Sequence, residues 1–283
     1  MRQRSVKARR WSDAAVKVIS GGAALVGVLA LGWILSVVAM RGLRAIDFDF
    51  FTKLPTPPGI PGGGLASAIM GTFAMTTLAS VIGITTGLLA GVFLAEFGRD
   101  SFFAESVRTG TNILMGTPSI IIGVFVYTLL VLTTGHFSGY AGAAALAIIM
   151  FPVVARTTED MLGLVPNELR ESALAIGAPR WRMTLGIVFR AARAGLLTGI
   201  LLAIARITGE TAPLLFTALN SPYWPKGLGG PTANLTVTIF NYAMSPYRDW
   251  QQMAWGASFL ITAGVLGVTI VARTLLREKK RTS

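Results

Sequence analysis

"TGTNILMGTPSIIIGVFVYTLLVLTTGHFSGYAGAAALAIIMFPVVA", residues 109–155, is a run of 47 residues that contains no Asp, Glu, Lys or Arg. A helix that crosses the hydrocarbon core of a bilayer needs about 20 mostly apolar residues. The run is therefore long enough for two such helices, and the turn-forming "TTGHFSG" (133–139) predicts the connection between them. We place the two spans near 112–133 and 138–155.

Four more apolar segments extend this pattern to both ends of the chain. The first follows a basic tail, as a signal peptide would, but its 23 uncharged residues (18–40) exceed the roughly 7–15 of a cleavable core. Before the second, "LPTPPGIPGGG" (54–64) contains too much Pro and Gly for a helix interior. The sequence therefore predicts an all-α membrane protein with six transmembrane helices, the other four being near 17–40, 69–95, 194–219 and 250–272.

The composition supports a membrane protein and excludes several functional classes. Of the 283 residues, 53% are hydrophobic and 13% are charged, whereas soluble domains carry about 25% charged residues. Cysteine is absent, and the single histidine, His136, lies in a predicted turn without other ligands nearby, so we expect no metal site. The net charge is +12, but no basic stripe with interleaved aromatic residues predicts a nucleic-acid partner. The expected surroundings are membrane lipid.

The basic residues predict the orientation of the six spans. Segments on one side of the membrane hold 19 Lys and Arg residues, and those on the other side hold five. Because basic loops stay in the cytoplasm, we expect both termini there, in a cytoplasmic (inner) membrane. The expected organisation is a basic tail (1–16), a first helix (17–40), a periplasmic loop (41–68), a core domain (69–273) with a cytoplasmic loop at 156–193, and a second basic tail (274–283).

The long cytoplasmic loop contains the signals of two helices joined by a sharp corner. Pro166 suits a first helical turn, Gly177 can adopt the left-handed conformation that ends a helix, and Pro179 can begin the next helix. Small residues near the corner permit close approach of another surface. From the residues alone, an amphipathic helix on the bilayer, with Trp181 at the headgroups, and a docking element for a cytoplasmic partner are about equally supported.

"ESALAIGAPRW" (171–181) resembles the EAA loop of permease subunits in ABC importers. That loop has a Glu, two small residues and, six positions after the Glu, a Gly, which here are Glu171, Ser172, Ala173 and Gly177. One position departs from the family, since Phe189-Arg190 stands where a Leu-Pro is common. Four further segments resemble PstA-type permeases of phosphate-specific ABC importers, and the resemblance runs from about residue 62 to the C-terminus. The segments are "GGGLASAIMGTF" (62–73), "GTPSIIIGVF" (116–125), "ARTTEDMLGLVP" (155–166) and "ITGETAPLLFTA" (207–218).

This resemblance implies a type I ABC importer permease fold and ATP-driven import of inorganic phosphate across the cytoplasmic membrane. It implies that the loop at 166–182 couples the chain to a separate ATPase. The implied partners are a second homologous permease chain, a dimer of ATP-binding subunits, and a periplasmic phosphate-binding protein, which could contact 220–249. The implied coupling residues are Glu171, Ser172, Ala173, Gly177 and Ala178.

The chain lacks the means to bind ATP itself. A phosphate-cradling loop of the G-x-x-x-x-G-K-[ST] type requires the dipeptide Gly-Lys, which occurs nowhere in the sequence. We therefore expect no cofactor in this chain, with ATP and Mg²⁺ bound by the partner ATPase.

"IARITGETAPLLF" (204–216) places Arg206 and Glu210 in the fifth apolar segment, where they are the only charged residues between 194 and 219. Each ion costs roughly 2.5–3.5 kcal/mol at the centre of a membrane helix, so such residues usually serve a function. At helical spacing they share one face with small residues, which we expect to turn toward protein or a pathway, with Pro213 bending the helix. That predicted face consists of Gly199, Leu202, Ala203, Arg206, Gly209, Glu210 and Pro213.

Two roles are open for this pair. Arg206 and Glu210 could form an ion pair that only fixes helix packing, since their i, i+4 spacing permits contact. Alternatively, the guanidinium could bind a passing oxyanion, with Glu210 holding or releasing it and with Thr208 and Thr211 beside it. The resemblance favours the substrate pathway.

Arg156 and Glu159 form a second candidate at the inner end of the fourth span. They could guide the anion out on the cytoplasmic side, but a surface ion pair is the favoured interpretation because such pairs are common and weak.

Two other functional classes are less well supported by the sequence. A self-contained secondary transporter or channel for an anion would commonly show internal repeats, and only "GLLAG" (87–91) and "GLLTG" (195–199) are similar, which apolar composition explains. An intramembrane enzyme would need partners for Glu210, and no second carboxylate, His or activated Ser accompanies it. We therefore expect no catalytic residues.

Overall fold

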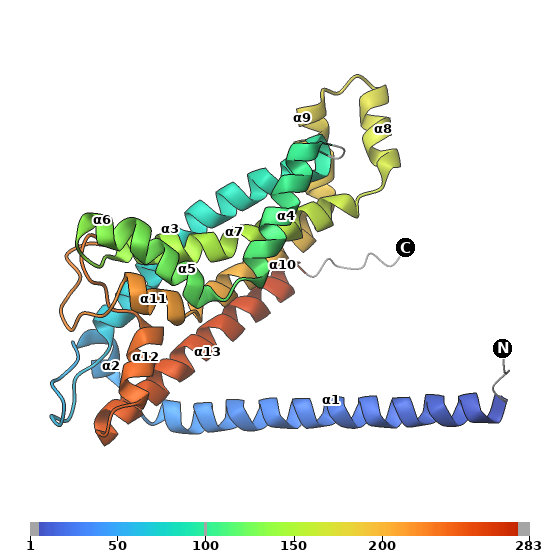
Figure 1. Cartoon of the computed structure of the whole chain (residues 1–283). Coiled ribbons are helices and arrows are strands. Elements are labelled where there is room, and N and C mark those ends of the chain that lie inside the picture. The colour runs from blue at the N-terminus through green and yellow to red at the C-terminus, as the bar shows by residue number, and fades with distance from the viewer. Residues whose placement is uncertain (1–5, 99–100, 277–283) are drawn as a thin grey trace.

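The computed structural model describes residues 6–98 and 101–276, which are entirely helix and loop (Figure 1). Long helices α3, α7, α10 and α13 form the body of the molecule, and α1 diverges from it. These five helices are α1 (Val6–Leu43), α3 (Ala66–Val92), α7 (Gly139–Gly163), α10 (Phe189–Thr208) and α13 (Arg248–Leu276). Each includes or forms part of a stretch that is long and apolar enough to cross a membrane.

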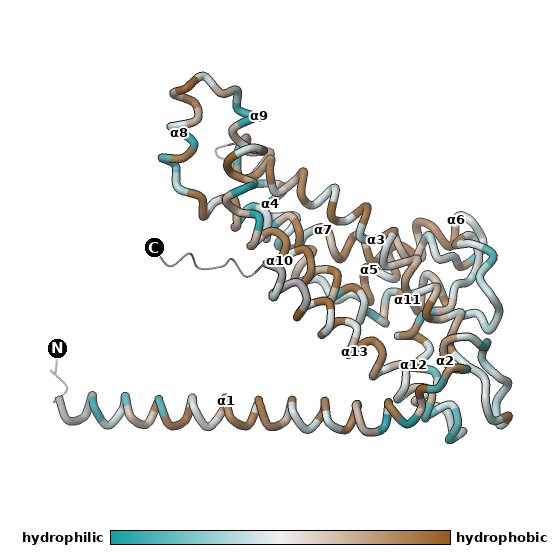
Figure 2. The backbone as a smooth tube through the Cα atoms, turned by 180° about the vertical axis from the view of Figure 1, so that it is seen from behind, coloured by the Kyte–Doolittle hydropathy of each residue, from teal (hydrophilic) through white to brown (hydrophobic). Residues whose placement is uncertain are grey.

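Shorter helices occupy the two ends of the body. One end carries α8 (Asn167–Ala175) and α9 (Arg180–Met183), and we call it the α8 end. The opposite end, which we call the α12 end, carries α2 (Phe48–Thr52) and α12 (Leu235–Ala243). Hydrophobic residues predominate along the long helices between these ends (Figure 2). The remaining helices are α4 (Phe102–Gly116), α5 (Ser119–Val126), α6 (Leu132–Thr134) and α11 (Ala212–Thr217).

Helices α3 and α7 form the centre of the packing. Gly83, Gly87 and Gly91, spaced four residues apart on α3, lie against Met150, Val154 and Thr158 of α7, respectively. A Cβ added at Gly87 would lie 2.7 Å from the Cβ of Val154. Small residues at this spacing let two helix backbones approach closely inside a membrane, where lipid supplies no hydrophobic drive for association.

Three π-helical segments lengthen these helices. Phe93–Phe97 continues α3, Tyr127–Val131 joins α5 to α6, and Thr184–Val188 joins α9 to α10. As a result α9 and α10 form one continuous span from Arg180 to Thr208.

The third predicted span is wrong as a single helix over 112–133. The chain bends by 105° between α4 and the segment Ser119–Thr134, and the two together are long and apolar enough to count as a sixth, broken span. Thr117 has extended backbone angles (φ −75°, ψ 129°). The cause is Pro118, because a residue before proline is disfavoured in the helical region.

The fifth predicted span is also wrong as one helix over 194–219. Helix α10 ends at Thr208 with Gly209 as its C-cap, and α11 begins at Ala212. Pro213 occupies the first turn of α11, where its missing N–H has no helical partner to lose. The proline therefore starts a new helix and does not bend a continuous one. The fourth span, by contrast, runs eight residues beyond the predicted end at 155, to Gly163.

Candidate coupling and transport site

The predicted helix, corner and second helix of the long loop are confirmed. Gly177 has φ +81°, a left-handed conformation that favours glycine. Its N–H donates to the carbonyl of Leu174 (2.9 Å), and the N–H of Ala178 donates to that of Ala173 (3.1 Å). These bonds satisfy carbonyls at the end of α8. Pro166 occupies the N-cap position of α8, one residue before the first turn in which it was predicted, and makes no capping hydrogen bond.

The corner presents both polar and apolar side chains at the surface. Of the five predicted coupling residues, Glu171, Ser172 and Gly177 are exposed, Ala178 is half-buried and Ala173 is buried. Ala173 packs into a cluster with Val165, Met183 and Val188 and thereby fixes α8 against α9. The apolar residue most exposed at the corner, Ile176, was missed by the sequence analysis and is 84% exposed.

A buried ion pair that sequence reasoning missed attaches α8 to the body. The guanidinium of Arg170, in α8, lies 2.8 Å from Glu96, in the π-helical end of α3. The two side chains are only 9% and 4% exposed. Arg170 also donates to the carbonyls of Leu162 (2.7 Å) and Val165, at and just beyond the end of α7. One side chain therefore joins three elements.

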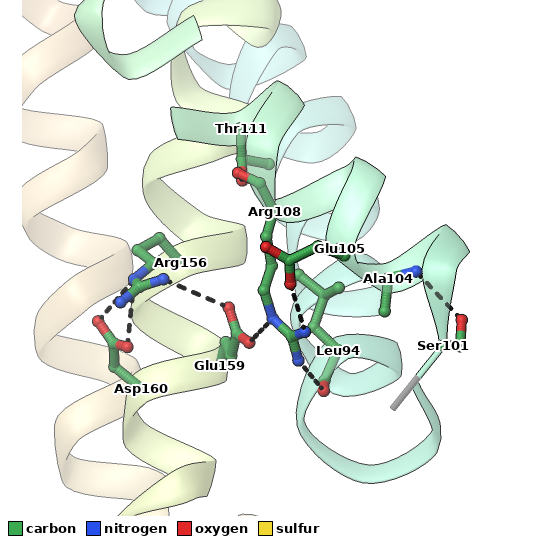
Figure 3. Close-up of polar contacts among 9 residues, drawn as sticks. All are labelled: Leu94, Ser101, Ala104, Glu105, Arg108, Thr111, Arg156, Glu159 and Asp160. Atoms are coloured by element: carbon green, nitrogen blue, oxygen red, sulfur yellow. Dashed lines mark hydrogen bonds and ion pairs between the residues drawn. The ribbon is translucent and has the colours of Figure 1, made fainter. Parts of the chain in front are cut away.

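A second charged cluster lies nearby, between α4 and α7 (Figure 3). The Nε of Arg108 donates to Glu159 at 2.6 Å, and its Nη2 donates to the carbonyl of Leu94 at 3.2 Å. Glu105 contacts the same guanidinium from a more exposed position, at 3.4 Å. Arg108 therefore ties the α4 part of the broken span to α7 and to the end of α3.

Arg156 and Glu159 are close, but each has a nearer partner. Their side chains approach to 3.8 Å, whereas Arg156 lies 3.2 Å from Asp160. Glu159 lies 2.6 Å from Arg108. Arg156 is 43% exposed and Glu159 is 15% exposed. The structure thus places this candidate pair in a network of charges with Arg108 and Asp160.

Arg206 and Glu210 lie where the chain leaves α10. Arg206 is in the last turn of α10, and Glu210 follows the C-cap Gly209. Their charged atoms are 3.8 Å apart, a loose ion pair without a hydrogen bond, and the side chains are 46% and 17% exposed. Thr208 donates its hydroxyl to the carbonyl of Ile204 (2.8 Å). Thr211 is half-buried in the break between the helices.

The predicted face extends only as far as Arg206, because α10 ends at Thr208 and Gly209, Glu210 and Pro213 lie beyond that end. Gly199 lies against Thr157 of α7, and Ala203 is buried in the main core. Leu202, Arg206 and Gly209 are instead exposed. The small residues serve packing within this chain, because they let α10 approach α7. The Arg206 side chain is 46% exposed in this chain.

Both helix breaks are joined to neighbouring elements. α5 packs on α11 so closely that a Cβ added at Gly123 would lie 2.6 Å from the Cα of Pro213. Beside the second break, the hydroxyl of Thr236 donates to the carbonyl of Glu210 (2.8 Å). The buried Asn234 caps α12 by accepting from the N–H of Val237 (2.8 Å). The sequence signal for this cap was an Asn directly before an apolar run.

The α12 end contains a cavity of about 680 Å³ in the region expected for a delivery contact. Its walls include Asn220, Tyr223 and Asn241, and the ring of Tyr242 stacks on that of Trp250 with centroids 4.3 Å apart. Burial raises the pKa of Tyr242 to about 12, so its hydroxyl stays protonated at physiological pH. The hydroxyl of Ser67, also in the wall, is buried without a hydrogen-bond partner among the residues described.

Comparison with known proteins identifies the type of molecule. Residues 83–280 match the family described as "Binding-protein-dependent transport system inner membrane component". The chain is 48% identical over 272 residues to the phosphate transport system permease protein PstA of Yersinia pestis, covering 96% of this chain and 92% of that protein. It is 48% identical over 279 residues to that of Xylella fastidiosa strain Temecula1, with 98% and 97% covered.

Solved structures share the fold at low sequence identity. An inward-facing MetNI methionine ABC transporter matches with a TM-score of 0.63 and 21% identity, covering 75% of this chain and 94% of that chain. A bacterial alginate ABC transporter matches with a TM-score of 0.66 and 15% identity, covering 97% and 99%. The all-α fold is therefore that of an ABC importer permease.

Proposed function

Because the chain belongs to the family of binding-protein-dependent transport system inner membrane components, we propose that it is the permease subunit of an ATP-driven importer of inorganic phosphate. One observation carries the proposal: the chain is 48% identical, over almost its full length, to phosphate transport permeases of two bacteria. The multi-pass helical structure agrees with a membrane subunit that encloses part of a pathway.

The corner between α8 and α9 is the proposed contact with a dimer of separate ATP-binding subunits. Its exposed Ile176 and half-exposed Leu174 are apolar side chains that a partner would cover. ATP and Mg²⁺ bind to that partner, since the chain has no phosphate-cradling loop. The α8 end is then cytoplasmic, which agrees with the excess of basic residues in the segments on that side.

The break between α10 and α11 is the proposed point of contact with the anion. Irregular backbone at membrane depth is tolerated where it is buried in protein or lines a water-filled cavity, and interrupted helices mark binding sites in other transporters. Arg206 stands at this break with a loosely held guanidinium whose planar fork matches an oxyanion. A second related permease chain supplies the opposite wall of the pathway, on the side where Arg206 is uncovered.

The cavity at the α12 end is the proposed region for delivery by a phosphate-binding protein. Tyr223, Asn220 and Asn241 belong both to its wall and to segment 220–249. A protein that docks there would release phosphate at the end of the molecule opposite the ATPase contact.

Reconstitution tests the proposal. Liposomes that contain the chain, a second permease and the ATP-binding subunits should take up radioactive phosphate when ATP and a phosphate-loaded binding protein are present. Liposomes that contain this chain alone should take up none. Phosphate flux through the chain alone, without ATP, would instead support the secondary transporter or channel, and stimulation only by another oxyanion would reject phosphate as the substrate.

A further inference from the structure

Three arginines gather in one cleft at the α12 end, between α1 and α13. Arg41 lies in the last turn of α1, Arg44 just after it, and Arg248 opens α13. The cleft has a volume of about 310 Å³. The rest of its wall consists of Ala45, Gln251, Gln252 and Trp255.

The positive charge of this cleft has no carboxylate partner among the residues described. The guanidinium of Arg41 lies over the ring of Trp255, 4.9 Å from its centroid, which orients its N–H donors. Of the nearest acids in the sequence, Asp47 caps α2 by accepting from the N–H of Phe50, and Asp249 lies in the first turn of α13. By contrast Lys53, at the same end, is paired with Asp49. Three like charges in a small cleft repel one another unless an anion joins them.

The position of the cleft indicates where that anion comes from. Gly42 lies against Phe259 and the backbone of Trp255, so α1 and α13 meet closely here and then separate. Both helices are candidate membrane spans, and the cleft lies where α1 ends and α13 begins, so we place it at the level of the lipid headgroups. Met40 and Leu43 beside it are 64% and 58% exposed, which provides apolar surface for acyl chains. Tryptophan is enriched at this boundary because its ring is amphipathic.

We propose that this cleft binds the phosphate group of an anionic phospholipid. Arg41, Arg44 and Arg248 donate charge-assisted hydrogen bonds to the phosphate oxygens. The side-chain amides of Gln251 and Gln252 contact the polar headgroup. The bound lipid joins the end of α1 to the start of α13, the site where α1 meets the body. The transported phosphate is not the ligand, because the cleft opens beside apolar surface on the outside of two spans.

Native mass spectrometry of the full chain, purified in its assembled transporter, tests this site. Lipid retention is compared between dioleoylphosphatidylglycerol and dioleoylphosphatidylcholine, which have the same acyl chains and differ in net charge. We expect the wild type to retain roughly tenfold more phosphatidylglycerol, since each basic residue near a membrane surface adds to the attraction. R41Q/R44Q/R248Q should remove this preference.

Two double variants separate the cleft from general electrostatic attraction. R44Q/R248Q leaves the contact between Arg41 and Trp255 in place and should still weaken the preference. K53Q/K226Q removes the same number of charges at the same end, outside the cleft, and should leave the preference unchanged. Equal effects of the two double variants, or no preference in the wild type, would overturn the proposal. Displacement of phosphatidylglycerol by millimolar inorganic phosphate would overturn it as well, by showing that free phosphate is the ligand.

Discussion

Arg206 carries five N–H donors, and among the described residues its one ion-pair partner is Glu210, at 3.8 Å. Without a hydrogen bond between them, the guanidinium can turn to another acceptor at little cost. This distinguishes it from Arg170 and Arg108, whose guanidinium groups are held by carboxylates and backbone carbonyls. Among these three arginines, Arg206 has the least firmly held guanidinium, which supports its proposed contact with the anion.

The substitution Arg206→Gln should lower phosphate uptake by roughly ten- to a hundredfold, because hydrogen bonds to a charged group contribute about 1.5–3 kcal/mol. Uptake of radioactive phosphate in reconstituted liposomes measures the effect. Arg206→Lys should restore the charge but only part of the uptake, because an ammonium lacks the planar fork. The matched control is Arg190→Gln, an exposed arginine at the other end of α10. Normal uptake by Arg206→Gln would make the residue structural.

The pair between Arg170 and Glu96 should be essential for stability as well as coupling. Removing one member of a buried ion pair costs about 3–5 kcal/mol, because the other charge stays buried and unpaired. Arg170→Gln and Glu96→Gln should each lower the unfolding temperature of the purified protein clearly, and the double variant should lower it less than the sum of the two. Lys53→Gln, in an exposed pair, should change the unfolding temperature little, because solvent screens such pairs. Additive effects of the two buried substitutions would show that the pair is not coupled.

At the residue scale, sequence reasoning worked where a charge stood alone in an apolar run. Arg206 and Glu210 attract attention because nothing else near them is charged, and they do lie close together. Glu96 and Arg170 are separated by 74 residues, and each stands in a segment where charge is ordinary. They meet because α8 packs against the π-helical end of α3, and no local sequence pattern predicts this tertiary contact.

At the scale of elements, the corner between α8 and α9 depends on the left-handed backbone of Gly177 (φ +81°). A left-handed residue other than glycine costs roughly 1–2 kcal/mol, although a Cβ at Gly177 would meet no atom of this chain within 4 Å. Gly177→Trp should therefore leave the chain folded but change the proposed docking surface. We expect ATP hydrolysis that is no longer coupled to phosphate uptake, measured on the same liposomes.

Gly186→Trp provides the control for this substitution. Gly186 has equally open surroundings and no left-handed backbone, and it lies in the π-helical segment beyond the corner. Normal phosphate uptake by Gly177→Trp, or an equal loss in both variants, would count against a coupling role for the corner.

Helix ends were predictable from the sequence where Gly and Pro stood between two helical patterns, without a continuous apolar run across them. Gly177 and Pro179 lie between two helical patterns, and the corner formed as expected. In the third and fifth spans, continuous hydrophobicity predicted unbroken helices, while Thr117-Pro118 and Gly209 ended them. Hydrophobicity indicates that the side chains of a segment can lie in lipid. It does not indicate that the backbone is continuous helix, which Pro and Gly can interrupt. In the interior of a membrane protein, neighbouring helices can stabilise a break that lipid would not.

At the scale of the whole molecule, the two ends differ in what they offer. The α8 end presents the corner, with its exposed apolar side chains and nearby buried ion pairs, and the α12 end presents a cavity with aromatic walls. The proposed orientation places these ends on opposite sides of a membrane, so that phosphate arrives at one and energy from ATP at the other.

The absence of cysteine from the sequence allows this orientation to be tested without altering the background. Ile176→Cys places one thiol at the corner, and Tyr223→Cys places one at the α12 end, where the native side chain is 73% exposed. A membrane-impermeant maleimide should label Tyr223→Cys in right-side-out vesicles and Ile176→Cys only in inside-out vesicles. The ATP-binding subunits should protect Ile176→Cys and not Tyr223→Cys, because docking covers only the corner. Labelling from the reversed sides would contradict the proposed orientation and place the termini outside. If Ile176→Cys is labelled in an active complex as readily as without the ATP-binding subunits, the corner is not the ATPase contact.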